Sequence, residues 1–224
     1  MSFLNINSTF MKYLGRFTDI MILGFWSIIC CLPIITIGTS ISATYSVTLK
    51  MVRDEECYIT KDFFKGFKSN FKNSTIVWVC FLFIGIIFYI NFQVMNGLTL
   101  KYETICRAML IAIIVYLFFI SGYIFPLIAR FENTMKQTIK NAIIMSLLAL
   151  PKSIVILIIN ISPILVVYYY PKIFPFILLF SISGVCYINS MMIRTIFEKY
   201  HSNSVEEGNE EERESIELIV DENS

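Results

Sequence analysis

Residues 108–129 read AMLIAIIVYLFFISGYIFPLIA, a stretch of 22 residues that contains no charged side chain. About 20 apolar residues in an α-helix, each rising about 1.5 Å, match the roughly 30 Å hydrocarbon core of a bilayer. Four further charge-free runs are long enough to consider as crossings, at residues 20–49, 73–100, 153–171 and 173–193. The chain is therefore predicted to be an all-α, polytopic helical membrane protein.

The composition agrees with a lipid environment. The 224 residues are 56% hydrophobic and 16% charged, whereas soluble domains carry about 25% charged residues. Nine of the 17 acidic residues lie in residues 200–224, and such a polar, aromatic-poor segment buries too little apolar surface to fold. We expect a helical membrane domain over residues 1–201 and an acidic disordered tail over residues 202–224, which is solvated or, alternatively, an interaction segment.

Basic residues indicate which side of the membrane each connection faces. Residues 50–72 contain six basic side chains and residues 130–152 contain four, and cytoplasmic loops are typically rich in Lys and Arg. The connections near 96–106 and 169–174 carry few charges, which favours the outer face. The last charge-free run then returns the C-terminus to the cytoplasm.

The first charge-free run is too long for one crossing, because residues 17–53 as a straight helix would extend roughly 55 Å. Pro33 and Gly38 are the residues expected to interrupt it. The predicted hairpin consists of an outgoing helix, a turn and a returning helix, at residues 17–32, 33–39 and 40–54. This arrangement gives six membrane helices with both chain ends in the cytoplasm. The alternative is five helices with the N-terminus outside.

The returning helix of this hairpin is rich in small side chains. Residues 40–48 read SISATYSVT, and small residues let helices approach one another closely. We therefore expect this helix to pack against neighbouring helices and not to face lipid.

Two amphipathic segments are predicted on the cytoplasmic face, each lying in the interface with its apolar side toward acyl chains and its lysines toward headgroups. The first presents a phenylalanine stripe, Phe64, Phe67 and Phe71, opposed by Lys61, Lys65, Lys68 and Lys72. The second presents the stripe Phe131, Met135, Ile139, Ala142, Ile143, Ser146 and Leu150, opposed by Glu132, Lys136 and Lys140.

Several of these segments resemble the YesL family of bacterial membrane proteins. The resemblance rests on RFTD at 16–19, CCLPIITIG at 30–38, TLKMVRDEE at 48–56, DFF at 62–64 and FKSNFK at 67–72, and later on YINS at 187–190 and RTIFE at 194–198. The family is a domain of unknown function, so the resemblance implies a membrane protein without implying an activity. Its members are often encoded beside carbohydrate ABC-importer components and sensor kinases.

Charged residues at helix ends, together with the helix break, are the candidate functional positions. Arg16 and Asp19 are three residues apart, share a helix face and are expected to pair, either as an interfacial anchor or as a coupling or gating pair. The acids after Arg53 are either solvated charges at a helix end or acceptors for basic residues of a partner. The candidate partner or gating positions are Arg16, Asp19, Pro33, Gly38, Arg53, Asp54, Glu55 and Glu56.

Polar side chains also occur within the charge-free runs, at Asn91, Gln93, Asn160 and Asn189. Each needs a hydrogen-bond partner at that depth, and we expect bonds between helices, with a solute path lined by these groups as the alternative.

The motifs of enzymes are not found in the sequence. The single histidine, His201, lies in the tail, and the crossing segments contain no acid pair, nucleophile with a base, or metal-ligand spacing. The chain also has no phosphate-binding loop or nucleic-acid motif. We expect no enzymatic activity, no cofactor, no metal and no nucleic-acid partner.

Two functions follow as hypotheses. The first is a non-catalytic accessory protein of the bacterial cell membrane that packs through residues 40–48 against a partner, such as a carbohydrate ABC-importer subunit or a sensor kinase. The second is a small-solute permease or channel, because interrupted helices such as the one at Pro33 and Gly38 form the binding sites of many transporters.

Overall fold

The computed structural model describes residues 3–96, 103–131, 134–173 and 180–197. Regular structure in these residues is helical, and none of them forms a β-strand. The elements in chain order are α1 (Phe3–Cys31), the 3₁₀ turn η1 (Ile34–Thr36), α2 (Ile37–Val52), α3 (Ile59–Asn96), α4 (Glu103–Arg130), α5 (Met135–Leu148), α6 (Leu150–Tyr169) and the 3₁₀ turn η2 (Pro171–Ile173). Residues 180–197 form a further helix, called the final helix below. The all-α prediction is confirmed for these parts, while the predicted acidic tail lies outside them.

Four helices, α1, α3, α4 and α6, are long and apolar enough to cross a membrane. A helix satisfies its own backbone N–H and C=O groups, which is necessary because hydrocarbon offers them no other partner. The chain is therefore an integral membrane protein. Four of the six predicted crossings have this support. By contrast, α2 has only 16 residues, which is about 24 Å of helix.

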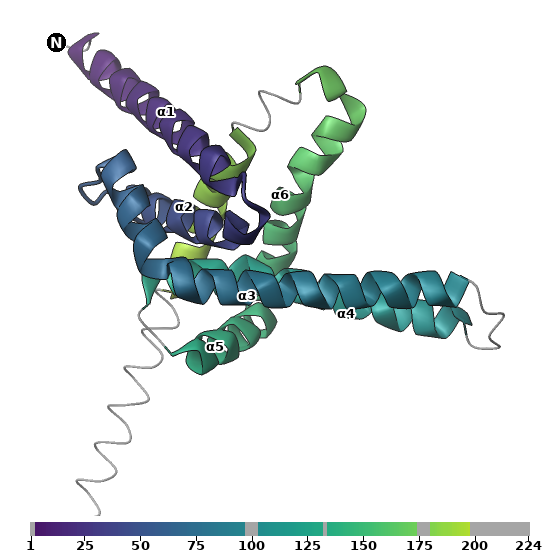
Figure 1. Cartoon of the computed structure of the whole chain (residues 1–224). Coiled ribbons are helices and arrows are strands. Elements are labelled where there is room, and N and C mark those ends of the chain that lie inside the picture. The colour runs from purple at the N-terminus through teal and green to yellow at the C-terminus, as the bar shows by residue number, and fades with distance from the viewer. Residues whose placement is uncertain (1–2, 97–102, 132–133, 174–179, 198–224) are drawn as a thin grey trace, which may run out of the picture.

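The arrangement of the helices is uneven (Figure 1). The helices α3 and α4 run side by side and extend well beyond the other elements, and α6 leaves this pair at a steep angle. The central helix is α2, which contacts α1, α3 and α4. A hydrophobic cluster joins the buried residues Leu23 of α1, Ala43 and Val47 of α2, and Phe63 of α3.

The predicted break at Pro33 is confirmed. The helix α1 ends at Cys31, and the chain turns through Pro33 and η1 before α2 begins. Side chains hold this turn in place, since the Thr36 hydroxyl donates to the Cys30 carbonyl oxygen at 2.7 Å and the Trp78 indole donates to the Ile34 carbonyl oxygen at 2.7 Å.

The prediction that Gly38 helps to break the helix is wrong. Gly38 lies in the first turn of α2, where a Cβ atom would stand 2.5 Å from the Trp78 Cβ and 2.9 Å from the Ser74 carbonyl oxygen. The glycine is required because α2 and α3 approach each other closely at this point. The turn is accordingly shorter than the predicted 33–39.

The expectation for the small-residue helix is confirmed, because eleven of the sixteen residues of α2 are buried. Its hydroxyl groups bond to neighbouring helices instead of to water. Thr44 shares a hydrogen bond of 2.7 Å with Ser27 of α1, and Thr39 shares one of 2.9 Å with Thr75 of α3. Close packing and satisfied hydroxyls make α2 the interior helix of the protein.

The first amphipathic segment forms the first turns of α3, which run at a steep angle to the long remainder of that helix (Figure 1). Phe64 and Phe71 are exposed, as the stripe predicts. Phe67, however, is half-buried against the cluster that contains Phe63. The packing face of this segment therefore includes Phe63, which the predicted stripe did not contain.

The second amphipathic segment forms a separate helix, α5. Its residues Ala142 and Ser146 are buried as members of the predicted stripe. These residues pack against α4, so the prediction that the apolar side turns toward acyl chains is wrong for them. The physical reason is that Ala142 and Met145 of α5 share one buried hydrophobic cluster with Ile124 and Ile128 of α4. Ile139 and Leu150 of the same stripe are exposed, as predicted.

Candidate functional site

Charged side chains gather where α2 ends and α3 begins. Arg16 of α1 forms an ion pair with Asp54, in the connection between α2 and α3, and also donates to the Tyr187 hydroxyl of the final helix at 3.3 Å. The predicted pairing of Arg16 with Asp19 is therefore wrong. Asp19 is half-buried on α1, and the connection that follows α2 brings Asp54 to the Arg16 guanidinium instead.

The backbone at the end of α2 explains why Asp54 is positioned this way. Asp54 has a φ of 55°, the left-handed conformation in which helices commonly end and which aspartate tolerates better than most residues. The Glu55 N–H donates to the Lys50 carbonyl oxygen at 3.2 Å, and the Asp54 N–H donates to the Met51 carbonyl oxygen at 3.3 Å. This pair of bonds is a Schellman motif, which satisfies the last carbonyls of α2.

Two further ion pairs complete this group. Lys50 of α2 pairs with Asp62 of α3 at 3.0 Å. The Asp62 carboxylate also accepts a hydrogen bond from the Tyr58 N–H at 3.0 Å. One carboxylate therefore joins α2 to α3 and caps the start of α3. Arg53 pairs with Glu55 at 2.9 Å. Neither Lys50 nor Asp62 was among the predicted site residues. An acidic side chain in the first turn of a helix was the signal that could have indicated Asp62.

The final helix reaches the same place, since Arg194 donates to the Val52 carbonyl oxygen at 2.9 Å. We call Arg16, Lys50, Arg53, Asp54, Glu55 and Asp62 the ion-pair cluster. It ties α1, α2 and α3 together at one end of α2.

Cys57 lies beside this cluster in the connection before α3. Burial, with the neighbouring Asp62 carboxylate as the next cause, raises the pKa of the Cys57 thiol to about 12. A thiol with this pKa stays protonated at neutral pH and is a poor nucleophile. The interactions that the cluster makes are ion pairs.

The predicted site residues separate into two groups. Arg16, Arg53, Asp54 and Glu55 belong to the ion-pair cluster, and Glu56 is exposed next to it. Pro33 and Gly38 lie at the opposite end of α2, which is about 22 Å away along the helix from Arg53. Within the described residues, no three His, Cys, Asp or Glu side chains are grouped as a metal site would require.

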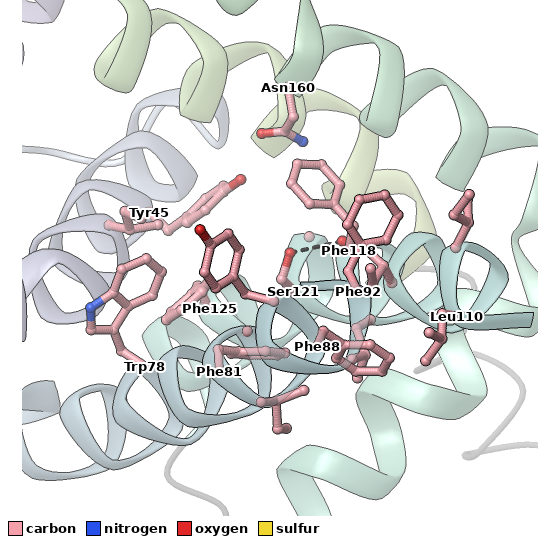
Figure 2. Close-up of a pocket in the computed structure, with 18 residues that line it drawn as sticks. Tyr45, Trp78, Phe81, Phe88, Phe92, Leu110, Phe118, Ser121, Phe125 and Asn160 are labelled. Atoms are coloured by element: carbon pink, nitrogen blue, oxygen red, sulfur yellow. Dashed lines mark hydrogen bonds between the residues drawn. The ribbon is translucent and has the colours of Figure 1, made fainter. Parts of the chain in front are cut away.

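A cavity of about 630 Å³ opens between α3 and α4, with α2 and α6 completing its wall. Figure 2 shows its lining, in which aromatic rings predominate. The labelled aromatic residues on α3 and α4 are Trp78, Phe81, Phe88, Phe92, Phe118 and Phe125. Sequence reasoning did not find this cavity, because it depends on how the helices diverge.

The polar side chains of the cavity wall, Tyr45, Ser121 and Asn160, form hydrogen bonds to other groups of the protein. The buried Asn189 side chain of the final helix donates to the Tyr45 hydroxyl at 3.2 Å and to the Asn160 side-chain oxygen at 3.4 Å. The Ser121 hydroxyl donates to the Phe118 carbonyl oxygen at 2.8 Å. The expected bonds between helices are confirmed for Asn160 and Asn189. Asn91 and Gln93 instead bond within α3, to Ile87 and Tyr89.

Four crossing-length helices together with a buried polar helix define a polytopic helical membrane protein. Residues 16–92 match the family model described as "Protein of unknown function, DUF624", and this match contains the whole ion-pair cluster. Over these residues the chain is similar to the YesL-like family that its sequence resembles.

The comparison with curated proteins gives a similar result. The chain is 24% identical over 212 residues to "Uncharacterized protein YteU" of Bacillus subtilis (strain 168), and the alignment covers 92% of this chain and 90% of that protein. No solved structure matches the chain.

Proposed function

We propose that this protein is a non-catalytic accessory protein of the bacterial cell membrane, which binds another membrane protein through one charged surface. That surface, called the charged end below, consists of residues 53–58 and the first turns of α3, residues 59–72. The YesL resemblance supports a carbohydrate ABC importer or its sensor kinase as the partner. The positive-inside tendency supports a cytoplasmic location for the charged end and for the C-terminus.

The observation that carries this proposal is the exposure of both signs of charge on the charged end. Three successive acids, Asp54, Glu55 and Glu56, are exposed. Four exposed lysines at helical spacing follow on α3, namely Lys61, Lys65, Lys68 and Lys72. Complementary charge gives an interface its specificity and its register.

The ion-pair cluster makes this surface suitable for recognition. The Asp62 carboxylate and the Schellman motif hold residues 53–58 in one conformation. A surface that is already ordered loses less conformational entropy when it binds. Many large apolar side chains elsewhere in the described residues are exposed, as expected for a surface in contact with lipid tails.

The partner surface differs from the one expected from the sequence. Residues 40–48 were expected to contact a partner, but this segment of α2 is covered by α1, α3, α4 and the final helix. A partner helix cannot reach it in this conformation. The charged end replaces it as the proposed contact.

The alternative, a small-solute permease, has less support in the described residues. Pro33 lies in an exposed turn, and the hydroxyl groups of α2 bond to other groups of the protein, as Thr48 does to the Ser190 hydroxyl at 2.8 Å and Ser40 does to the Ser27 carbonyl oxygen at 2.9 Å. A helix break that builds a transport site should instead free polar groups toward a solute. Specific uptake of a sugar into proteoliposomes by the purified protein would favour the permease.

A photo-crosslinking amino acid in place of Glu56 tests the accessory role. Crosslinking in native membranes, followed by mass spectrometry, should trap one reproducible partner, an importer subunit or a sensor kinase. The matched control carries the same group in place of Leu148, an exposed residue of α5, and should not trap that partner. Recovery of the protein alone, or of the same proteins from both positions, would contradict the proposal.

A further inference from the structure

We propose that the cavity between α3 and α4 holds one acyl chain of a membrane phospholipid. The proposal is independent of the partner role above, because it concerns a different surface and a different ligand.

The lining of the cavity selects a hydrocarbon. Phenylalanine, tryptophan, leucine and isoleucine side chains form most of the wall, and Figure 2 shows the aromatic rings around the shared space. The Tyr45 hydroxyl and the Asn160 side-chain oxygen already accept hydrogen bonds from the Asn189 side chain. A sugar, with a hydroxyl on nearly every carbon, would leave many of its polar groups without partners here.

The shape of the cavity selects a single chain. Trp78 and Phe92 both line it and are fourteen residues apart on α3, which corresponds to about 21 Å of helix. A partner helix of that length and about 10 Å diameter would occupy about 1,600 Å³. The cavity has about 630 Å³, so a helix does not fit, whereas one extended hydrocarbon chain does.

The cavity lies where the acyl chains of the bilayer can reach it. Both α3 and α4 are long and apolar enough to cross a membrane, and the lining residues Phe92, Ile111 and Ile114 are exposed at the protein surface. An acyl chain of the bilayer can therefore enter from the side. Water does not compete well, because apolar cavities stay dry, and an empty cavity forfeits the dispersion contacts of its walls.

One tryptophan makes the occupant observable. The chain has two tryptophans, and only Trp78 lines the cavity. In a Trp26→Phe background, Trp78 is the sole indole reporter, and bromine atoms quench its fluorescence on contact. The probe is a phosphatidylglycerol brominated along one acyl chain, added to the delipidated protein in detergent.

A glycine in the wall allows a clean block of the cavity. Gly85 lines the cavity, and a Cβ atom added to it meets nothing within 4 Å. Gly85→Leu therefore places its side chain in the cavity without a backbone clash. Gly184 on the final helix has equally open space and does not line the cavity, so Gly184→Leu is the matched control.

We expect saturable quenching of Trp78 in the Trp26→Phe protein and in its Gly184→Leu variant, and at least a twofold loss of quenching in Gly85→Leu. Native mass spectrometry should find one tightly bound phospholipid in the first two proteins and none in the third. Ile114→Phe, at an exposed lining position, gives a second block whose bound lipid can be counted if Gly85→Leu fails to fold.

Equal quenching in all variants would show that bromine reaches Trp78 from annular lipid, and would overturn the proposal. If a soluble sugar protected Trp78 from quenching by the brominated lipid, the proposal would also be overturned, in favour of a solute site. A bound phospholipid that persists in both blocked variants would have the same consequence.

Discussion

Thr48 of α2 and Ser190 of the final helix, 142 residues apart in the chain, share a buried hydrogen bond of 2.8 Å. Both hydroxyls are fully buried. This bond attaches the last described helix directly to the interior helix.

We expect the Thr48–Ser190 bond to contribute a modest coupling energy. Double-mutant cycles of such bonds in a membrane protein average about 0.6 kcal/mol and reach at most about 1.7 kcal/mol. Thr48→Val, Ser190→Ala and the double variant, unfolded in mixed detergent, should give a coupling within this range. A coupling of zero would mean that the two hydroxyls do not bond in the folded protein.

Gly38→Ala should destabilise the protein by roughly 1–3 kcal/mol, because the added methyl group meets the Trp78 Cβ and the Ser74 carbonyl and a tightly packed site must shift to accept it. Thermal unfolding in detergent measures the change. The control is Gly15→Ala, where an added Cβ meets nothing within 4 Å, and it should leave the unfolding temperature unchanged or slightly higher. Equal effects of the two substitutions would contradict the close approach of α2 and α3.

Two substitutions of Asp54 separate its charge from its backbone conformation. Asp54→Gly keeps the positive φ accessible and removes the carboxylate that pairs with Arg16. The Asp54 side chain is 63% exposed, so the loss of this pair should cost less than about 1 kcal/mol. Asp54→Val also opposes the left-handed conformation and should cost roughly 1–2 kcal/mol more. Equal stabilities of the two variants would argue against the Schellman motif at the end of α2.

Cys57 should react slowly with maleimides. Its thiol has a pKa of about 12 instead of 9.0, so the thiolate is scarce at pH 8, and its higher intrinsic nucleophilicity compensates only in part. In a variant that retains Cys57 alone, alkylation at pH 8 should be at least tenfold slower in the folded protein than in denaturant. The rate should still be rising at pH 10, where an ordinary thiol has levelled off. A plateau by pH 9.5 would show that the thiol is not buried beside Asp62.

The proposed orientation predicts opposite labelling at two lysines. In a cysteine-free background, Lys65→Cys on α3 should react with a membrane-impermeant maleimide only after the cells are permeabilised. Lys172→Cys in η2 should react in intact cells, and both side chains are exposed. Labelling of position 65 in intact cells would place the charged end outside and would contradict the proposed cytoplasmic partner.

The sequence alone was enough to predict the helical class, the break at Pro33 and the burial of residues 40–48. These features are local or nearly so. In hydrocarbon a helix is the simplest way for a segment to satisfy its own backbone, and small side chains indicate close packing whichever helix is the neighbour. A proline removes one helical hydrogen bond and so favours a break, although α4 and α6 continue through Pro126 and Pro163.

The tertiary structure decided which residues meet. Arg16 pairs with Asp54 and not with Asp19, although Asp19 is nearer in the chain, because the end of α2 turns back onto α1. Gly38 is needed for the approach of Trp78 and not for a turn. The cavity likewise depends on how α2 and α6 lie against α3 and α4. Such contacts depend on the angles at which helices pack, and those angles are set by side chains far apart in the chain, which no local pattern contains.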